Sequence, residues 1–499
     1  MESNPAQLVA DFLSEYRASG VYSRARIARL AELATAEDCK IAESASRAFF
    51  TALVERLADS FEPDAVSLYN RVFAQVIQAC RRDPRAVRLD RELDARGLRT
   101  EEELVARADQ LRRGFSLTDS IDSSGRVQRV IVLSRVTLGA DVAITSVIIE
   151  RMKRRFPGAE IVLVGGNKAS ELFGGDPRVC FKEISYCRAG TTVERLLSWV
   201  DLLRFVRELT ATMTRGEYLI VDPDSRLTQL GLLPIGWPTL QPQEQDLATQ
   251  QPDYLFFPSR EYGSGTSRSL SELTSSWLDE LFGEGEPTYP SVSLRSNDIE
   301  LARDLLNQMK RGSRPVIAIN FGVGENPLKR IGGDFEATLV ARLIQEGAAI
   351  VLDKGAGEDE TRRADAVIAE ATGIEREGHR VRAVEITERT LERAASSEHR
   401  DADVLVWNGR IGVLAGLIGE SDLYIGYDSA GQHIAAALGV QCIDVFAGFS
   451  SLRMLDRWRP TGRAEAHVVA VDTLSGAGGV NELVVEVQRY ASEVFRARG

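Results

Sequence analysis

The chain has 499 residues, which is too long for one hydrophobic core, so its length predicts two or three domains. Its hydrophobic fraction of 44% and charged fraction of 27% are typical of a globular protein. The net charge of −12 argues against a protein that coats nucleic acid, and we expect no nucleic-acid partner. The five cysteines and four histidines show no metal-ligand spacing, which argues against a structural zinc site or a disulfide framework.

The sequence carries no evident targeting or membrane segment. Its first residues lack a basic region followed by an apolar core, so we expect no signal peptide. Its apolar runs are shorter than the roughly 20 residues that span a bilayer, so we expect no transmembrane segment. A cytoplasmic protein is therefore expected, either free or peripheral to the inner membrane.

Residues 1–124 are predicted to form an all-α domain. Glycine is rare there, and apolar residues recur at helical spacing, as in Leu8, Phe12 and Tyr16 and again in Phe49, Leu53 and Leu57. Such a domain can join copies of the chain into a homo-oligomer, cap its neighbour or dock a protein acceptor, and its sequence does not choose among these roles.

Residues 125–300 show the alternation of strands and helices that is typical of a Rossmann-like domain. An apolar strand at Gln128–Ser134 leads through Gly139 to Asp141, which opens an amphipathic helix. A second strand follows at Ile161–Val164, and this βαβ pattern predicts a doubly wound parallel sheet. Further strands are expected at Tyr218–Val221 and Tyr254–Phe257, and the glycine and proline residues of 283–299 indicate a domain boundary.

A second Rossmann-like domain is expected at residues 301–480, followed by a terminal helix within 481–499. Strands are predicted at Val316–Ile319, Ala349–Leu352, Val404–Trp407, Leu423–Tyr427 and Ile443–Phe446, with a helix from about Asp334 to Gln345. The strongly charged span 375–403 is interpreted as a solvated insertion, in which Arg382–Ile386 is a candidate strand. The fold class is therefore α/β, with two Rossmann-like domains facing a cleft.

The most informative stretch runs from Asp428 to Gly439. It follows one predicted strand and precedes another, so a helix begins there at the carboxyl end of the sheet. Free N–H groups at such a helix start bind anions, and open α/β sheets bind ligands at this edge. Ser429, Ala430 and Gly431 are small enough to admit a phosphate, with Asp428 and His433 beside it. The alternative is a plain connection in which the polar residues cap the helix and His433 packs in the core.

Three other groups offer binding or catalytic chemistry. Lys329 and Arg330 follow a strand and its glycines, where cations can neutralise a diphosphate, or they belong to a solvated loop. Glu358, after Gly357, can accept hydrogen bonds from a ribose or satisfy the helix dipole. Asp141 is either a general base or a helix-start acid. The triplet Asp222-Pro223-Asp224 is interpreted as a turn in preference to a Mg²⁺ or Mn²⁺ site.

Together these residues resemble glycosyltransferase family 9, whose members include the ADP-heptose–lipopolysaccharide heptosyltransferases. The resemblance covers roughly residues 128–480 and is most specific at 417–448. The family's Asp-Ser/Thr-Gly-x-x-His before an alanine-rich helix is similar to Asp428–His433, and its Phe-Gly-rich continuation is similar to residues 446–448. Its first Gly-Asp loop, its loop lysine and its Gly-x-x-Glu-like loop are similar to Gly139–Asp141, to Lys329 and to Gly357-Glu358.

The resemblance implies a GT-B fold and an inverting, metal-independent transferase with no bound cofactor. The donor is a nucleotide-diphosphate sugar, with heptose or hexose, and the acceptor is a glycan, a lipid-linked molecule or a protein. Asp141 is then the base, Lys329 and the residues 429–431 stabilise the diphosphate, and Asp428 binds sugar hydroxyls. Glu358 is then expected to contact the ribose, Ile411 the nucleobase of the donor, and His433 either the phosphate or the turn itself. The remaining expected donor contacts are Gly322, Gly324, Arg330 and Gly357.

Two other functions stay open on the sequence. A GT-B fold also suits a nucleotide-sugar 2-epimerase. A non-catalytic protein that binds nucleotide sugars, with the helical domain recruiting a partner, is the second alternative.

Overall fold

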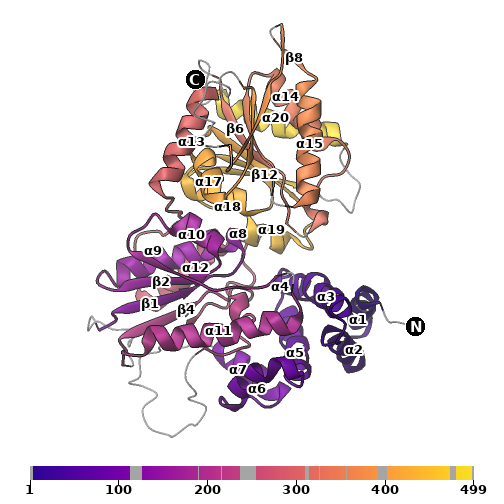
Figure 1. Ribbon diagram of the computed structural model, residues 1–499, viewed down its shortest axis with the longest axis vertical. Helices are drawn as coiled ribbons and strands as arrows, with labels where there is room; N and C mark the ends of the chain where they lie inside the picture. The colour runs from indigo at the N-terminus through magenta and orange to yellow at the C-terminus, as the bar shows by residue number, and fades with distance from the viewer. Residues whose placement is uncertain are drawn as a thin grey trace.

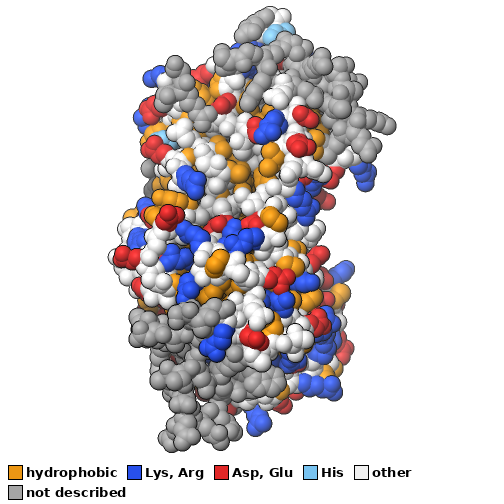
Figure 2. All heavy atoms as spheres, turned by 90° about the vertical axis from the view of Figure 1, so that its left-hand side faces the viewer, with side chains coloured by type: hydrophobic (Ala, Val, Ile, Leu, Met, Phe, Trp, Pro, Cys, Tyr) orange, Lys and Arg blue, Asp and Glu red, His pale blue; other side chains and the backbone are white. Residues whose placement is uncertain are grey.

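The computed structural model describes residues 4–112, 126–188, 190–214, 216–235, 254–309, 314–324, 326–355, 357–376, 378–390, 402–471 and 479–496. Three parts follow one another along the chain: a helical part and two α/β domains (Figure 1). Within the described residues, every helix is too short or too polar to cross a bilayer. Figure 2 shows basic and acidic side chains interspersed over the described part of one face.

The N-terminal part is helical, as the sequence predicts. The first helix begins after Asn4, whose side chain accepts a hydrogen bond from the Ala6 nitrogen, and ends at Gly20 in the left-handed conformation. Its helices are α1 (Pro5–Ser19), α2 (Arg24–Ala34), α3 (Cys39–Arg47), α4 (Glu55–Ala58), α5 (Pro63–Cys80), α6 (Val87–Asp94) and α7 (Glu101–Arg112), with a π-helical turn at Ala48–Val54.

The helical part does not close its own core. Its buried aromatic residues, such as Phe50 and Phe73, belong to one apolar cluster with Leu196, Trp199 and Leu203 of α11 (Thr192–Thr210). That helix belongs to the first α/β domain, and a capping box of Thr191 and Glu194 fixes its start. The helical part is therefore a layer packed on this domain.

The first α/β domain has five parallel strands in the order β3-β2-β1-β4-β5. Its side chains alternate: Val130 and Val132 face one apolar cluster, and Ile131 and Leu133 face another that contains α11. Its remaining elements are β1 (Arg129–Leu133), α8 (Leu138–Ala140), a π-helical turn (Asp141–Thr145), α9 (Ser146–Arg155), β2 (Glu160–Gly165), α10 (Asn167–Phe173), β3 (Val179–Glu183), β4 (Tyr218–Asp222), a 3₁₀ turn (Arg226–Thr228), β5 (Tyr254–Phe256) and α12 (Leu270–Phe282).

The second α/β domain has seven parallel strands in the order β10-β11-β7-β6-β12-β13-β14. Helices α13, α17 and α18 share one apolar cluster, and α14, α15 and α20 share the other. The bounds are α13 (Ser296–Met309), β6 (Val316–Asn320), a 3₁₀ turn (Pro327–Lys329), α14 (Phe335–Gln345), β7 (Ala349–Asp353), α15 (Glu358–Thr372), β8 (Glu375–Arg376), β9 (His379–Arg380), β10 (Ala383–Thr387), β11 (Val404–Asn408), α17 (Ile411–Gly419), β12 (Leu423–Tyr427), α18 (Ala430–Leu438), β13 (Cys442–Ala447), α19 (Leu452–Trp458), β14 (Ala466–Val471) and α20 (Val480–Arg496).

The two edges of this sheet differ from the sequence interpretation. The charged span 375–403 contains β10, which confirms the candidate strand at 382–386 and pairs with β11 as an edge strand; Ile386 is fully buried, so this part is not a solvated insertion. Residues 391–401 of the span lie outside the described residues. The other edge strand, β14, follows helix α19 and was not predicted.

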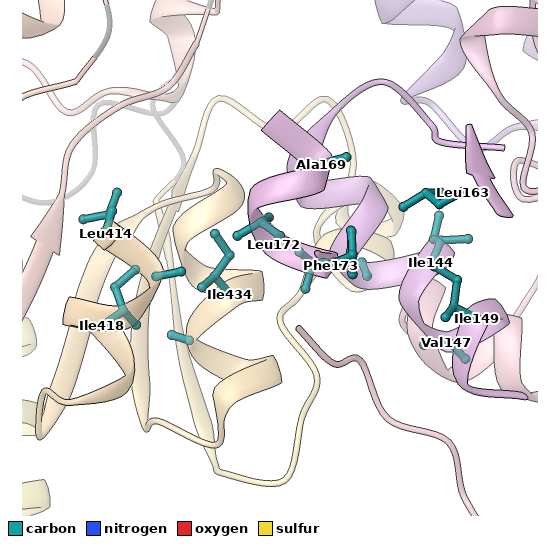
Figure 3. Packing of buried hydrophobic residues seen from close by; sticks show 14 of the residues in the cluster. Ile144, Val147, Ile149, Leu163, Ala169, Leu172, Phe173, Leu414, Ile418 and Ile434 are labelled. Carbon is teal, nitrogen blue, oxygen red and sulfur yellow. The ribbon is translucent and has the colours of Figure 1, made fainter. Parts of the chain in front are cut away.

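An apolar contact joins the two α/β domains. Leu172 and Phe173 of α10 lie opposite Ile434 of α18, with Leu414 and Ile418 of α17 farther along the same layer (Figure 3). These side chains belong to one continuous cluster, so the carboxyl edge of β1 is held against the start of α18.

Candidate functional site

The site begins at the turn between β12 and α18, where small residues surround one tyrosine. A Cβ on Gly426 would stand 2.4 Å from the Tyr424 hydroxyl, and a Cβ on Gly431 would stand 2.0 Å from it. Tyr424 is fully buried beneath the first turn of α18. Gly431 therefore makes room for a protein side chain. Ser429 and Ala430, which are partly exposed, are the residues of this turn open to a ligand.

Lys329 and Asp428 form a close ion pair at this turn. The Lys329 ammonium donates to Asp428 Oδ2, and the second oxygen accepts from Gln432 Nε2 at 3.0 Å. Burial lowers the pKa of Lys329, but the charge of Asp428, helped by Asp59 and Asp444, raises it above the ordinary value. A permanently charged lysine thus stands beside the open N–H groups of α18, which suits a diphosphate.

A second acid, Asp444 of β13, lies behind the pair and is fully buried. Burial, and then the negative charge of Asp428, raise the pKa of Asp444 well above its ordinary value. Among the described residues, no donor reaches its oxygens. The sequence signal that could have indicated this buried acid is the presence of Asp444 within the apolar strand predicted at Ile443–Phe446.

The carboxyl ends of β6 and β7 form the neighbouring part of the site. Asn320 Nδ2 donates to Asp353 at 2.6 Å, and burial raises the pKa of Asp353 to about 6. The Glu360 carboxylate lies against this edge: a Cβ on Gly322 would be 3.1 Å from its Oε1, and a Cβ on Gly355 would be 2.7 Å from its Oε2. Glu360 also accepts from the Gly357 nitrogen at 3.3 Å.

The structure separates several predicted donor residues from this group. Glu358 is exposed on the first turn of α15, one position from Asp359, which pairs with Arg330. Arg330 is therefore drawn toward α15 and away from Lys329. Gly324, with φ of +61°, is open to solvent, and Ile411 is partly buried at the first position of α17.

His433 lies at the contact between the two α/β domains. Its side chain is buried, edge-on to Trp458 with ring centroids 6.0 Å apart. A Cβ on Gly139 would be 3.1 Å from its Cδ2. Burial lowers the pKa of His433 to about 4, so the imidazole is neutral at physiological pH and brings no positive charge to a phosphate.

Asp141 is buried and accepts three hydrogen bonds. Its carboxylate accepts from Ser134 Oγ at 2.7 Å, from the Arg135 nitrogen at 2.7 Å and from Thr145 Oγ1 at 2.9 Å. Burial raises the pKa of Asp141, and these hydrogen bonds partly oppose that effect. The arrangement fixes the loop after β1 and leaves little of the carboxylate for a substrate.

The acids of the Asp222-Pro223-Asp224 triplet are likewise satisfied within the protein. Asp222 accepts from Thr228 and Tyr254, each at 2.7 Å, and Asp224 pairs with Arg260 at 3.1 Å. These partners support the interpretation as a turn. Among the described residues, no cluster of acids, histidines and cysteines has the arrangement of a metal site.

Comparison with known proteins gives structural matches. No family model and no curated protein matches the sequence. A glycosyl transferase family 9 structure from Veillonella parvula matches with a TM-score of 0.50 and 15% identity, over 74% of this chain and 93% of that chain. The ADP-heptose lps heptosyltransferase II of E. coli matches with a TM-score of 0.47 and 13% identity, over 74% of this chain and 100% of that chain.

The first of these matches shows a shared fold. The two parallel sheets, each covered by helices on both faces, have the GT-B arrangement that the sequence predicted, and the added N-terminal part is helical. The resemblance to glycosyltransferase family 9 is thus confirmed at the level of the fold.

Proposed function

We propose that this chain is a glycosyltransferase that moves a sugar from a nucleotide-diphosphate donor to an acceptor hydroxyl, with inversion and without a metal. The observation that carries the proposal is the Lys329–Asp428 pair at the start of α18, on the carboxyl edge of the seven-stranded sheet. The GT-B fold supports the same reaction class. A heptose or hexose donor and a glycan, lipid-linked or protein acceptor are consistent with it.

In the proposed mechanism the nucleotide-sugar donor binds to the second α/β domain. The diphosphate lies at the N–H groups of α18, where the helix dipole and Lys329 neutralise the negative charge that develops as the sugar leaves. Asp428 then gives up its hydrogen bond from Lys329 and accepts hydrogen bonds from the hydroxyls of the sugar. The ribose lies at the ends of β6 and β7, beside Asn320 and Glu360.

The decisive experiment compares Lys329→Met with Lys153→Met in full-length protein. Lys153 is also a poorly exposed lysine in an ion pair, with Asp176, and lies on α9 away from the site. We expect Lys329→Met to lower the release of nucleoside diphosphate from ADP-, UDP- or GDP-hexoses about 10²–10³-fold, the usual effect of removing one transition-state contact. Lys153→Met should keep wild-type turnover. Equal activity in both variants would refute the assigned site.

A nucleotide-sugar 2-epimerase and a non-catalytic binding protein predict different products. Epimer formation without any acceptor supports the former. Calorimetric binding of ADP, UDP or GDP without turnover of any sugar donor supports the latter.

A further inference from the structure

The turn between α4 and α5 reaches from the helical part to the second α/β domain. Phe61 is buried, and its ring lies edge-on to Trp458 with centroids 6.1 Å apart. Arg453 of α19 donates to the Phe61 carbonyl at 3.0 Å and pairs with Glu62 at 3.2 Å. Helix α4 accordingly lies below α19, where the three parts meet (Figure 1).

This docking brings the turn that contains Asp59 close to the proposed donor site. Trp458 contacts His433 of α18, so the turn that holds Phe61 lies next to the helix that receives the diphosphate. The charges of Lys329 and Asp428 from the second domain, and of Arg226 and Arg135 from the first, act on the pKa of Asp59. Charged groups of all three parts of the molecule thus converge on it.

The Asp59 carboxylate is chemically different from that of Asp141. Its main chain donates to the Glu55 carbonyl at 2.9 Å, but among the described residues no group donates a hydrogen bond to its side chain. Burial raises its pKa, while the nearby cations Lys329 and Arg226 oppose that rise. A carboxylate with free lone pairs and a raised proton affinity meets the requirements of a general base better than one that already accepts three hydrogen bonds.

We propose that Asp59, supplied by the helical part, is the general base that receives the proton of the attacking acceptor hydroxyl. This inference rests on the proposed glycosyl transfer. As the proton passes to an Asp59 oxygen, the hydroxyl oxygen bonds to the anomeric carbon. The bond from that carbon to the diphosphate oxygen breaks, and its electron pair leaves with the nucleoside diphosphate beside Lys329. The helical part therefore completes the active site.

The test uses three isosteric variants of the full-length chain: Asp59→Asn, Asp141→Asn and Asp64→Asn. Asp64 is an exposed acid at the start of α5 and is the matched control. The assay is nucleoside diphosphate release from ADP-, UDP- and GDP-hexoses with water as acceptor, together with calorimetric binding of ADP, UDP and GDP. Circular dichroism and thermal unfolding check that each variant folds.

We expect Asp59→Asn to lower kcat about 10²–10⁴-fold, the usual contribution of a general base, with diphosphate binding equal to or tighter than wild type. In Asp59→Asn the fall in rate that the wild type shows at acidic pH should disappear. Asp59→Glu should restore part of the rate. Asp64→Asn should match wild type, and Asp141→Asn should lower stability more than kcat.

Three results would overturn the assignment. Turnover by Asp59→Asn within threefold of wild type would exclude Asp59 as the base while leaving the proposed transfer intact. Equal losses of nucleotide binding and turnover would make Asp59 structural. If wild-type protein neither binds nor turns over any of these nucleotides, both the transfer and the base are refuted.

Discussion

Gly448 lies directly beneath the carbonyl of Leu328: a Cβ on Gly448 would stand 2.2 Å from that oxygen and 3.0 Å from the Lys329 nitrogen. Its φ of +68° is also a conformation that favours glycine. The glycine that follows β13 thereby lets the Lys329 loop close over the sheet edge. The ion pair between Lys329 and Asp428 depends on a residue that touches neither side chain.

Gly448→Ala should displace the Lys329 loop and weaken diphosphate binding about 10-fold or more. It should also lower the free energy of unfolding by about 1–3 kcal/mol through overpacking. The control is Gly439→Ala, because Gly439 has a similar φ of +75° but no atom within 4 Å of its added Cβ. Calorimetry and urea unfolding check this, and equal binding in the two variants would contradict it.

Glu360→Gln should weaken nucleotide binding, while Glu358→Gln should not. Glu360 lies against Gly322 and Gly355 at the strand ends, whereas Glu358 is exposed. Loss of a charged hydrogen bond to a ribose corresponds to about 1.5–3 kcal/mol, or roughly 10-fold or more in the dissociation constant. The two variants remove the same charge from the same helix turn, so a common effect of charge cancels. A larger loss with Glu358→Gln would restore the original sequence prediction.

This pair of acids illustrates what the sequence could and could not predict. Apolar runs and glycine punctuation located the strand, loop and helix at 349–372 because these signals are local. The choice between Glu358 and Glu360 depends on which face of the first helical turn meets the sheet edge. The hydrogen bond from the Gly357 nitrogen to Glu360 Oε2 at 3.3 Å decides that choice, and the spacing to the glycines suggested the nearer acid.

The same limit applies to contacts between segments that are far apart in the sequence. The turn at Asp428 and the loop at Lys329 were predicted separately from local patterns, and the structure brings them into contact. The role of residues 59–62 had no local signal, because it depends on Phe61 packing against Trp458 from a distant part of the chain. Strand β14 escaped prediction since its side chains are mostly half-exposed at a sheet edge.

His433 should make the protein less stable as the pH falls from about 6.5 to about 4. The unfolded histidine takes up a proton near pH 6.5, whereas burial lowers the folded pKa to about 4. The folded state therefore binds fewer protons in this window, and the free energy of unfolding falls with pH by up to roughly 3 kcal/mol. Below about pH 4 the effect is constant.

His433→Gln should remove this component from the pH dependence of urea unfolding, measured between pH 4.5 and 7.5. Comparing wild type with the variant is essential, because Asp222 and Asp353, whose pKa values burial raises to about 6, act with the opposite sign. The control is His379→Gln, since His379 is exposed on β9. An unchanged pH slope in His433→Gln would mean that the buried imidazole does not resist protonation.

Gly139→Val should separate the reaction partners without removing the donor site. A Cβ on Gly139 would stand 3.1 Å from His433 Cδ2 and 3.4 Å from the Ala430 Cα, so a larger side chain pushes the loop after β1 away from α18. The overpacking should cost about 1–3 kcal/mol of stability. Misalignment of the two domains should lower turnover about 10²-fold, while nucleoside diphosphate binding, confined to the second α/β domain, should change little.

Gly158→Val is the matched control, because nothing lies within 4 Å of its added Cβ. Parallel losses of binding and turnover in Gly139→Val would show that the loop belongs to the donor site itself, and wild-type turnover would show that the contact between Gly139 and His433 has no part in alignment.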